Sequence, residues 1–212
     1  MTDVVAERPD APATARNREP LLQVLRDELS GCCSVLEIGS GTGQHAVFFA
    51  EQMPEIVWQT SDVPANHPGI LAWLDGAGLA NVLPPLPLDV LRDADAGGRY
   101  DAVFSANTAH IMSIDAVVAM FALVGRLLPA AGPLCLYGPF RLEGDFTSDS
   151  NAAFDASLKV RDPAMGIRDI EYLDELARAA GMERRALIAM PANNFVSVWR
   201  KIATAAAIDR VS

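Results

Sequence analysis

Cysteine, histidine and positive charge are scarce in this chain of 212 residues, and each shortage excludes a class of function. Three cysteines, of which Cys32 and Cys33 are adjacent, make neither a disulfide framework nor a zinc set, so buried thiols in a reducing compartment are expected. The three histidines and the scattered acidic residues lack the spacing of metal ligands, so no metal site is predicted. The net charge of −10 disfavours nucleic acid and anionic lipid as partners, because binding to either needs a basic surface.

Long apolar runs are also missing. No run reaches the roughly 18–20 residues that span a bilayer, and residues 1–17 lack the apolar segment of a secretion signal. We therefore expect a cytoplasmic protein that does not bind membranes. Half of the residues are hydrophobic, which allows one domain with a substantial core. The expected organisation is a flexible arm at 1–14, a single domain at 15–202 and a tail at 203–212.

A strand, a glycine-rich turn and a helix follow one another near residue 40. Val35–Ile38 is a short run of β-forming residues, Gly39, Gly41 and Gly43 alternate after it, and residues 46–50 are apolar and compatible with a helix. This order is typical of the first β-α-β unit of a nucleotide-binding fold. The glycines allow a tight turn and a close approach of backbone N–H groups to a ligand.

The spacing of these glycines limits the choice of ligand. A dinucleotide fingerprint has a glycine or alanine where this chain has Gln44, and the Gly-Lys-Ser/Thr of a triphosphate loop is absent. The pattern Glu37-x-Gly39-x-Gly41-x-Gly43 instead resembles motif I of class I methyltransferases that depend on S-adenosylmethionine (SAM). In that family the loop curves around the amino-acid end and the ribose of the cofactor. The resemblance therefore implies a SAM site that includes Glu37 and the three glycines.

Two aspartates extend the predicted cofactor site. Asp62 ends the expected second strand, where a carboxylate accepts hydrogen bonds from ribose hydroxyls; the alternative is a turn-initiating residue before Pro64. Residues 82–90 contain too many prolines for a central strand, but 86–89 can form a short one. Asp89 at its end matches the place where methyltransferases contact the adenine amino group. Its alternative role is to cap a helix that begins near Leu91.

Asn107 and His110 follow the strand that is expected to begin near Tyr100. Chemistry in an open α/β sheet is presented beyond the carboxyl ends of strands, so both side chains are candidates for a site. We assign Asn107 to the cofactor. Histidine titrates near neutral pH, so His110 is a candidate general base, although a lone histidine is more often structural.

A polar segment at 141–169 is too long for an ordinary connection and is expected to be a substrate lid with a short central helix. The alternative is a salt-bridged surface insertion. Asp155 and Asp162 in this segment are further candidates for the catalytic base. An amphipathic helix is expected at 15–29, and its first residues either reach into the site or form a solvated helix start. The predicted substrate-binding residues are Arg16, Asn17, Tyr137, Phe140, Thr147, Asn151, Arg161 and Asn194. Asn194 also belongs to an Asn-Asn turn, in which positive φ angles and a structural role are the default.

The order of expected elements is five α/β units followed by an antiparallel closing pair. It resembles the Rossmann-like class I methyltransferase fold, a doubly wound α/β sheet of seven strands, mostly parallel, with an antiparallel terminal strand. A narrower resemblance is to an uncharacterised methyltransferase-like family that is labelled as a domain of unknown function. The segments that carry it are 16–20, 41–46, 137–140, 146–148, 150–155, 161–163, 166–169 and 190–194.

The leading hypothesis is a SAM-dependent methyltransferase that methylates an oxygen or nitrogen atom of a small molecule, for instance in secondary metabolism. The chain lacks the Asn/Asp-Pro-Pro-Tyr signature of enzymes that methylate amide nitrogens of nucleic acids and proteins. One alternative is the same fold adapted to a cyclisation or an elimination; another is a non-catalytic subunit. A nicotinamide dehydrogenase is disfavoured by Gln44. The oligomeric state stays open, and both a homodimer and a complex with a partner subunit are possible.

Overall fold

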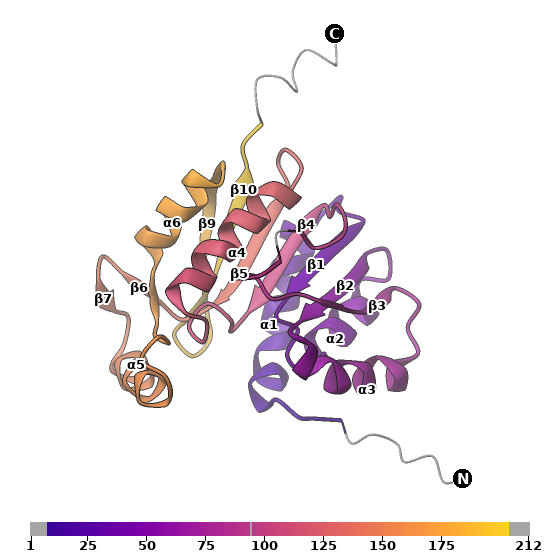
Figure 1. The fold of residues 1–212 in the computed structure, drawn as a ribbon, viewed down its shortest axis with the longest axis horizontal. Coiled ribbons are helices and arrows are strands. Elements are labelled where there is room, and N and C mark those ends of the chain that lie inside the picture. The colour runs from indigo at the N-terminus through magenta and orange to yellow at the C-terminus, as the bar shows by residue number, and fades with distance from the viewer. Residues whose placement is uncertain (1–7, 94, 204–212) are drawn as a thin grey trace.

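A computed structural model describes residues 8–93 and 95–203 of the chain (Figure 1). A seven-stranded sheet has the order β3-β2-β1-β4-β5-β10-β9, in which β10 alone runs antiparallel to its neighbours. Its strands are β1 (Ser34–Ile38), β2 (Val57–Asp62), β3 (Val82–Pro87), β4 (Ala102–Ala106), β5 (Pro133–Gly138), β9 (Met182–Met190) and β10 (Asn194–Lys201). This is the predicted fold class, and the prediction is confirmed.

Helices cover both faces of the sheet (Figure 1). On one face α1 (Pro12–Glu28), α2 (Gln44–Gln52) and α3 (His67–Ala77) pack against a core that includes Phe49, Trp58 and Phe104. On the other face α4 (Ile114–Leu127) and α6 (Ile170–Ala179) cover a second core. The central strands are buried on both sides, which explains their nearly continuous apolar sequences. Within the described ranges no helix is long and apolar enough to cross a membrane.

The first helix begins earlier than its periodicity predicts. It starts at Pro12 instead of residue 15, so Thr14 is already buried within it and Pro20 lies in its interior rather than in its first turn. Part of the expected arm at 1–14 is therefore helical. Residues 1–7 and, except for residue 203, the expected tail at 203–212 lie outside the described residues.

The proline-rich strand also differs from the prediction. β3 spans Val82–Pro87 and includes two-thirds of the stretch 82–90 that we judged unsuitable for a central strand. It is an edge strand, where prolines are tolerated because one side of the strand needs no hydrogen-bond donors. A register shift in β2 between Gln59 and Ser61 accompanies its pairing with β3. No helix follows near Leu91; the chain makes a turn there.

The predicted lid is a small substructure beside the main sheet (Figure 1). Three short strands, β6 (Phe140–Leu142), β7 (Asp145–Phe146) and β8 (Arg168–Asp169), pair in the order β7-β6-β8. The expected central helix is α5 (Asp149–Arg161), whose N-terminus is capped by Ser148. Because β8 leads directly into α6, this substructure is tied to the main sheet at both of its ends.

Candidate functional site

A cavity of about 990 Å³ lies at the carboxyl ends of β1, β2 and β4. Its lining comes from residues before and within α1, the glycine turn, the segment from β2 to α3, the exit loop of β4, α5, and the turn between β9 and β10. The carboxyl edge of an open α/β sheet is the usual place for a ligand site. Of the predicted site residues, the cavity is lined by Arg16, Gly39, Gly41, Asp62, Asn107, His110, Asn151 and Asn194.

The backbone N–H groups of the glycine turn are bonded within the protein. Those of Gly39 and Ser40 both donate to the Ser61 carbonyl at 3.0 Å, and that of Gly41 donates to Asp62 Oδ2 at 2.7 Å. The three glycines have positive φ angles, and a Cβ on Gly39 would lie 2.5 Å from Thr108 Cγ2. The turn is therefore tight, as predicted, but the N–H groups of Gly39, Ser40 and Gly41 are not left open for a phosphate.

Asp62 is held in place at the end of β2. Its Oδ1 accepts hydrogen bonds from the Val63 N–H at 2.7 Å and from Asn66 Nδ2 at 2.9 Å, while Oδ2 accepts the bond from Gly41. A carboxylate can accept about four hydrogen bonds, so one further donor from the cavity can be accommodated. The sequence-based assignment of Asp62 to a hydroxyl-bearing ligand fits this geometry.

Glu37 lies behind the turn, not in the cavity. One of its carboxylate oxygens, Oε2, accepts hydrogen bonds from Ser40 Oγ at 3.0 Å and from Trp58 Nε1 at 3.1 Å. Burial raises the pKa of the Glu37 carboxyl to about 7, more than the two hydrogen bonds lower it. Glu37 therefore supports the turn from below and does not reach a ligand directly.

Two other predicted cofactor residues do not line the described cavity. Gly43 precedes α2 and packs against Ile70 of α3, with 3.1 Å between a Cβ built on Gly43 and Ile70 Cα. Asp89 forms a turn in which its Oδ1 accepts the Leu91 N–H at 3.1 Å and its carboxylate pairs with Arg92 at 3.4 Å. The local turn, instead of a ligand, accounts for Asp89.

Residues before α1 close one side of the cavity, which we did not predict from the sequence. Gln44 holds them, because its Oε1 accepts the Ala11 N–H at 2.7 Å and its Nε2 donates to Asp10 Oδ1 at 2.9 Å. Trp73 Nε1 donates to the Pro9 carbonyl at 2.8 Å. Pro9 and Ala11 line the cavity, so this segment is part of the site.

Asn17 joins three elements beneath that segment. Its Oδ1 is 2.8 Å from Nε2 of His45, which lines the cavity from α2, and its side chain also bonds the hydroxyl of Tyr137 on β5. His45 stacks on Phe49, and burial lowers the pKa of His45 to about 4. Asn17 and Tyr137 therefore position the walls of the cavity and do not line it themselves.

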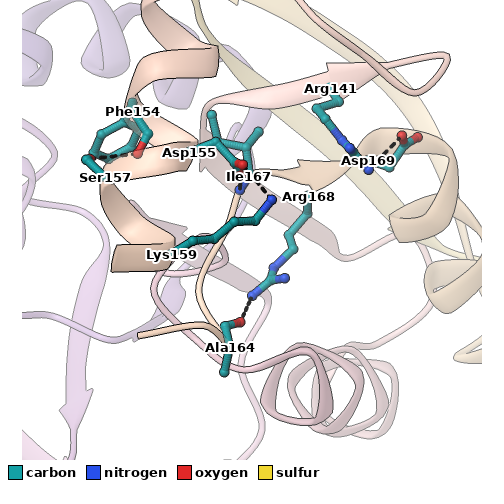
Figure 2. Close-up of polar contacts among 9 residues, drawn as sticks. All are labelled: Arg141, Phe154, Asp155, Ser157, Lys159, Ala164, Ile167, Arg168 and Asp169. Carbon is teal, nitrogen blue, oxygen red and sulfur yellow. Dashed lines mark hydrogen bonds and ion pairs between the residues drawn. The ribbon is translucent and has the colours of Figure 1, made fainter. Parts of the chain in front are cut away.

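His110 lines the cavity from the exit loop of β4, as predicted. Burial, followed by the nearby guanidinium groups of Arg168 and Arg161, lowers the pKa of His110 to about 4, so the ring is neutral at pH 7. Arg168 fixes this loop, because its guanidinium donates to the carbonyls of Ala109 and Met112. The same guanidinium donates to the carbonyl of Ala164 in the lid (Figure 2). The edge of the His110 ring meets Phe154 of α5 at 5.3 Å between centroids.

The two predicted lid bases have structural contacts instead. Asp155 is buried, pairs with Lys159 at 2.6 Å and accepts the Ile167 N–H at 2.8 Å, which ties α5 to the strand that follows (Figure 2). Asp162 Oδ1 accepts the Ala164 N–H at 2.8 Å in an exposed turn. Neither carboxylate lines the cavity. Both accept backbone hydrogen bonds that hold the lid segment together, Asp155 from α5 and Asp162 from the turn after it.

The turn between β9 and β10 meets α5. Asn151 Nδ2 donates to Thr147 Oγ1 and to the Asn193 carbonyl, both at 2.9 Å. The positive φ angles fall on Ala192 and Asn193, one residue earlier than the two asparagines we expected, because Asn194 already belongs to β10. Asn194 and Asn151 line the cavity, and Thr147 supports them from outside.

Of the remaining predicted substrate residues, one lines the cavity and two do not. Arg16 is exposed and lines the cavity, whereas Phe140 is 1% exposed and belongs to the core beneath β6. Arg161 is exposed at the end of α5, away from the lining. Lining residues that the sequence did not indicate include Ser40 and Asn66, whereas Phe154 lies in the lid segment that the sequence singled out. Across the described residues no group of three or more His, Cys, Asp or Glu side chains could hold a metal ion.

Comparisons with known proteins agree with this architecture. Residues 8–201 match the model of a family described as protein of unknown function (DUF938). Among solved structures, an O-methyltransferase family protein from Burkholderia thailandensis is similar with a TM-score of 0.76 and 16% identity over 91% of this chain. Human N-acetylserotonin methyltransferase, solved in complex with SAM, is similar with a TM-score of 0.70 and 14% identity, also over 91%. This chain spans 58% and 59% of the lengths of those two proteins.

Proposed function

The chain belongs to the DUF938 family of proteins of unknown function, and we propose that it is a SAM-dependent methyltransferase acting on a small molecule. The observation that carries the proposal is the glycine turn, whose N–H groups are bonded to Ser61 and to the Asp62 carboxylate. A phosphate placed there would meet the Asp62 carboxylate and find the N–H groups of Gly39, Ser40 and Gly41 already bonded. A cofactor with ribose hydroxyls and no phosphate fits the same turn.

The residues present fit SAM in two further respects. A Cβ on Gly41 would point into open space, so the turn leaves room for a ligand directly above it. Arg16 at the cavity wall supplies a cation for the carboxylate of the cofactor, and Asp62 supplies an acceptor for its ribose. The solved structures similar to this chain include a SAM-dependent methyltransferase and a methyltransferase in complex with SAM, which supports the same cofactor here.

When bound, SAM supplies an electrophilic methyl group, and the protein contributes alignment and the exclusion of water. Alignment alone is worth effective molarities of ~10⁵–10⁸ M in favourable cases. Asn107, which we assign to the cofactor, and His110 both line the cavity beyond β4. His110 can orient the nucleophile of the acceptor there. His110 is neutral at pH 7, so its ring nitrogen can accept the proton of a hydroxyl or amine. A base with so low a pKa is weak, and we assign it mainly an orienting role.

Calorimetric titration with SAM and S-adenosylhomocysteine tests the proposal. We expect micromolar binding by the wild type and at least tenfold weaker binding by Asp62→Ala, equivalent to about 1.4 kcal/mol. Asp75→Ala is the matched control, because Asp75 is an exposed aspartate on α3 that does not line the cavity, and its binding should equal that of the wild type. Absence of binding to the folded wild-type protein would reject the methyltransferase proposal.

A further inference from the structure

His45 carries an unprotonated ring nitrogen at the cavity. Its other ring nitrogen, Nε2, lies 2.8 Å from Asn17 Oδ1. An amide oxygen can only accept a hydrogen bond, so Nε2 carries a proton. Burial, and to a smaller extent the positive charge of Arg18, lowers the pKa of His45 to about 4, so the ring is neutral at pH 7. A neutral imidazole has one N–H group, and Nδ1 is therefore a hydrogen-bond acceptor.

Tyr137 fixes the orientation of the Asn17 amide independently. Burial raises the pKa of the Tyr137 phenol, and the hydrogen bond with Asn17 opposes this increase. A hydrogen bond that lowers the pKa of a phenol is one that donates to its oxygen, because it favours the charged form. The NH₂ group of Asn17 therefore faces Tyr137, which leaves Oδ1 to accept the proton of His45 Nε2.

The Nδ1 atom is accessible from the cavity. His45 is the second residue of α2, and side chains of a helix lean toward its N-terminus, here the glycine turn that lines the cavity. One face of the ring stacks on Phe49, with 5.4 Å between the centroids. No described residue bonds Nδ1, yet the fully buried side-chain atoms without a partner in the described ranges are Arg141 Nε and Ser197 Oγ. Nδ1 is thus exposed to the cavity that the ring lines.

Two guanidinium groups lie near this acceptor. Arg16, which lines the cavity, and Arg18 flank Asn17 on α1, and their positive charges act on Tyr137 and on His45 respectively. This end of the cavity attracts a carboxylate and repels an isolated ammonium group. An α-amino acid carries a carboxylate and an amino donor on the same carbon, so it satisfies both the cations and Nδ1. A ligand with the carboxylate alone would leave Nδ1 without a donor.

From this arrangement, and resting on the proposed function, we infer that His45 Nδ1 accepts a hydrogen bond from the α-amino group of SAM. Asn17 is the positioning residue that holds the ring for this contact. A donor that carries a positive charge forms a stronger hydrogen bond than a neutral one, so the contact selects a cofactor that retains its amino group. Arg16 matches the carboxylate of the same amino-acid end, and Asp62 matches the ribose.

S-adenosylhomocysteine and its deamino analogue, in which hydrogen replaces the α-amino group, isolate this contact. Calorimetry measures the affinity of each. We expect the wild type to bind S-adenosylhomocysteine at least tenfold more tightly than the analogue. In His45→Phe, which keeps a ring to stack on Phe49, the preference should fall below threefold. Gln52→Ala, at an exposed residue at the end of the same helix, should keep the preference of the wild type.

The nitrogen NMR signals of the His45 ring give a second readout, in the wild-type protein. We expect Nε2 to be protonated and Nδ1 to be unprotonated in the absence of ligand. S-adenosylhomocysteine should shift the Nδ1 signal in the direction of a hydrogen-bonded nitrogen, and the deamino analogue should not. Asn17→Ala should reduce the preference for S-adenosylhomocysteine at least threefold, because the ring loses the partner that orients it.

The deamino analogue also reports whether a variant keeps its cavity, since it does not use Nδ1; its affinity for His45→Phe should stay within threefold of the wild-type value. The inference is overturned by equal binding of the two ligands to the wild type, by a protonated or unshifted Nδ1, or by an unchanged preference in folded His45→Phe. In each of these cases S-adenosylhomocysteine still binds, and the proposed function stands. Absence of S-adenosylhomocysteine binding to the folded wild type rejects both proposals.

Discussion

Glu37→Gln should make the stability of the protein less dependent on pH. The folded-state pKa of Glu37 is about 7, raised from 4.5 by burial. A carboxyl with a raised pKa stabilises the fold while it is protonated, below pH 4.5, and this contribution is lost as the pH rises through about 7. At 1.36 kcal/mol per pKa unit, the wild type should lose about 2.5 kcal/mol between pH 5 and pH 8 through this residue.

A neutral glutamine has no such dependence. Its Oε1 can accept the bonds from Ser40 and Trp58, which both go to one oxygen of Glu37. The effect of the new NH₂ group on stability does not depend on pH. At each pH we therefore compare the free energy of unfolding of the variant with that of the wild type. The diagnostic quantity is how much this difference changes between pH 5 and pH 8. Comparison with the wild type cancels the opposite effect of His45 and His110, whose lowered pKa values destabilise the fold below pH 6.5.

Urea unfolding, followed by circular dichroism at pH 5 and pH 8, measures this quantity. We expect the variant to be less stable than the wild type by about 2.5 kcal/mol more at pH 5 than at pH 8. Glu51→Gln, at an exposed glutamate of α2, is the control and should show the same difference at both pH values. If the pH dependence of Glu37→Gln runs parallel to that of the wild type, the assignment of Glu37 as a buried, readily protonated support of the turn is refuted.

Three further substitutions or titrations test the packing around the cavity. Gly39→Ala should lower the free energy of unfolding by about 1–3 kcal/mol from overpacking against Thr108, in addition to the cost of a positive φ angle. Asn17→Ala should cost about 1–3 kcal/mol for each of the two buried polar groups that lose their partner, again measured by urea unfolding. The ¹H NMR signals of the His110 ring should not titrate between pH 5.5 and 8, since its pKa is about 4.

Each of these predictions has its own comparison. Gly144→Ala changes a glycine with a φ of +82° and no atom within 4 Å of a Cβ, so it isolates the backbone cost from the clash in Gly39→Ala. Glu19→Ala changes an exposed residue of the same helix as Asn17 and should leave stability nearly unchanged. A titration midpoint of His110 near 6.5 would contradict its burial.

Features set by local spacing could be predicted from the sequence. The glycine turn after β1 and the acidic residue at the end of β2 depend on contacts within one β-α-β unit, and they lie together in the cavity. The order of the strands followed from the alternation of apolar segments and helices. Gly41 and Asp62, which are far apart in the sequence, are joined by a hydrogen bond that the register of parallel strands dictates.

Features set by long-range packing could not be predicted in this way. The direction of Asp155 depends on the return of the chain at Ile167, and the burial of Phe140 depends on the pairing of β6 with β8. We predicted that the segment before α1 is a flexible arm, because the α3 residues that it packs against are far away in the sequence. The available signal was a pair of glycines on α3, Gly69 and Gly76, which lie two helical turns apart and leave room for this segment. A Cβ on Gly69 would meet Pro9, and a Cβ on Gly76 would meet Arg8.

The position of β10 has a consequence for the synthesis of the protein. This strand, the last in the part of the chain that the structure describes, lies between β5 and β9, and its first residue helps to line the cavity. Until it has left the ribosome, β5 presents an apolar and unpaired edge, a state that favours aggregation. The same strand brings the turn that accepts the hydrogen bond from Asn151. A chain that stops before β10 therefore lacks both the closed sheet and the complete cavity, so folding and the capacity to bind are gained together when β10 is added.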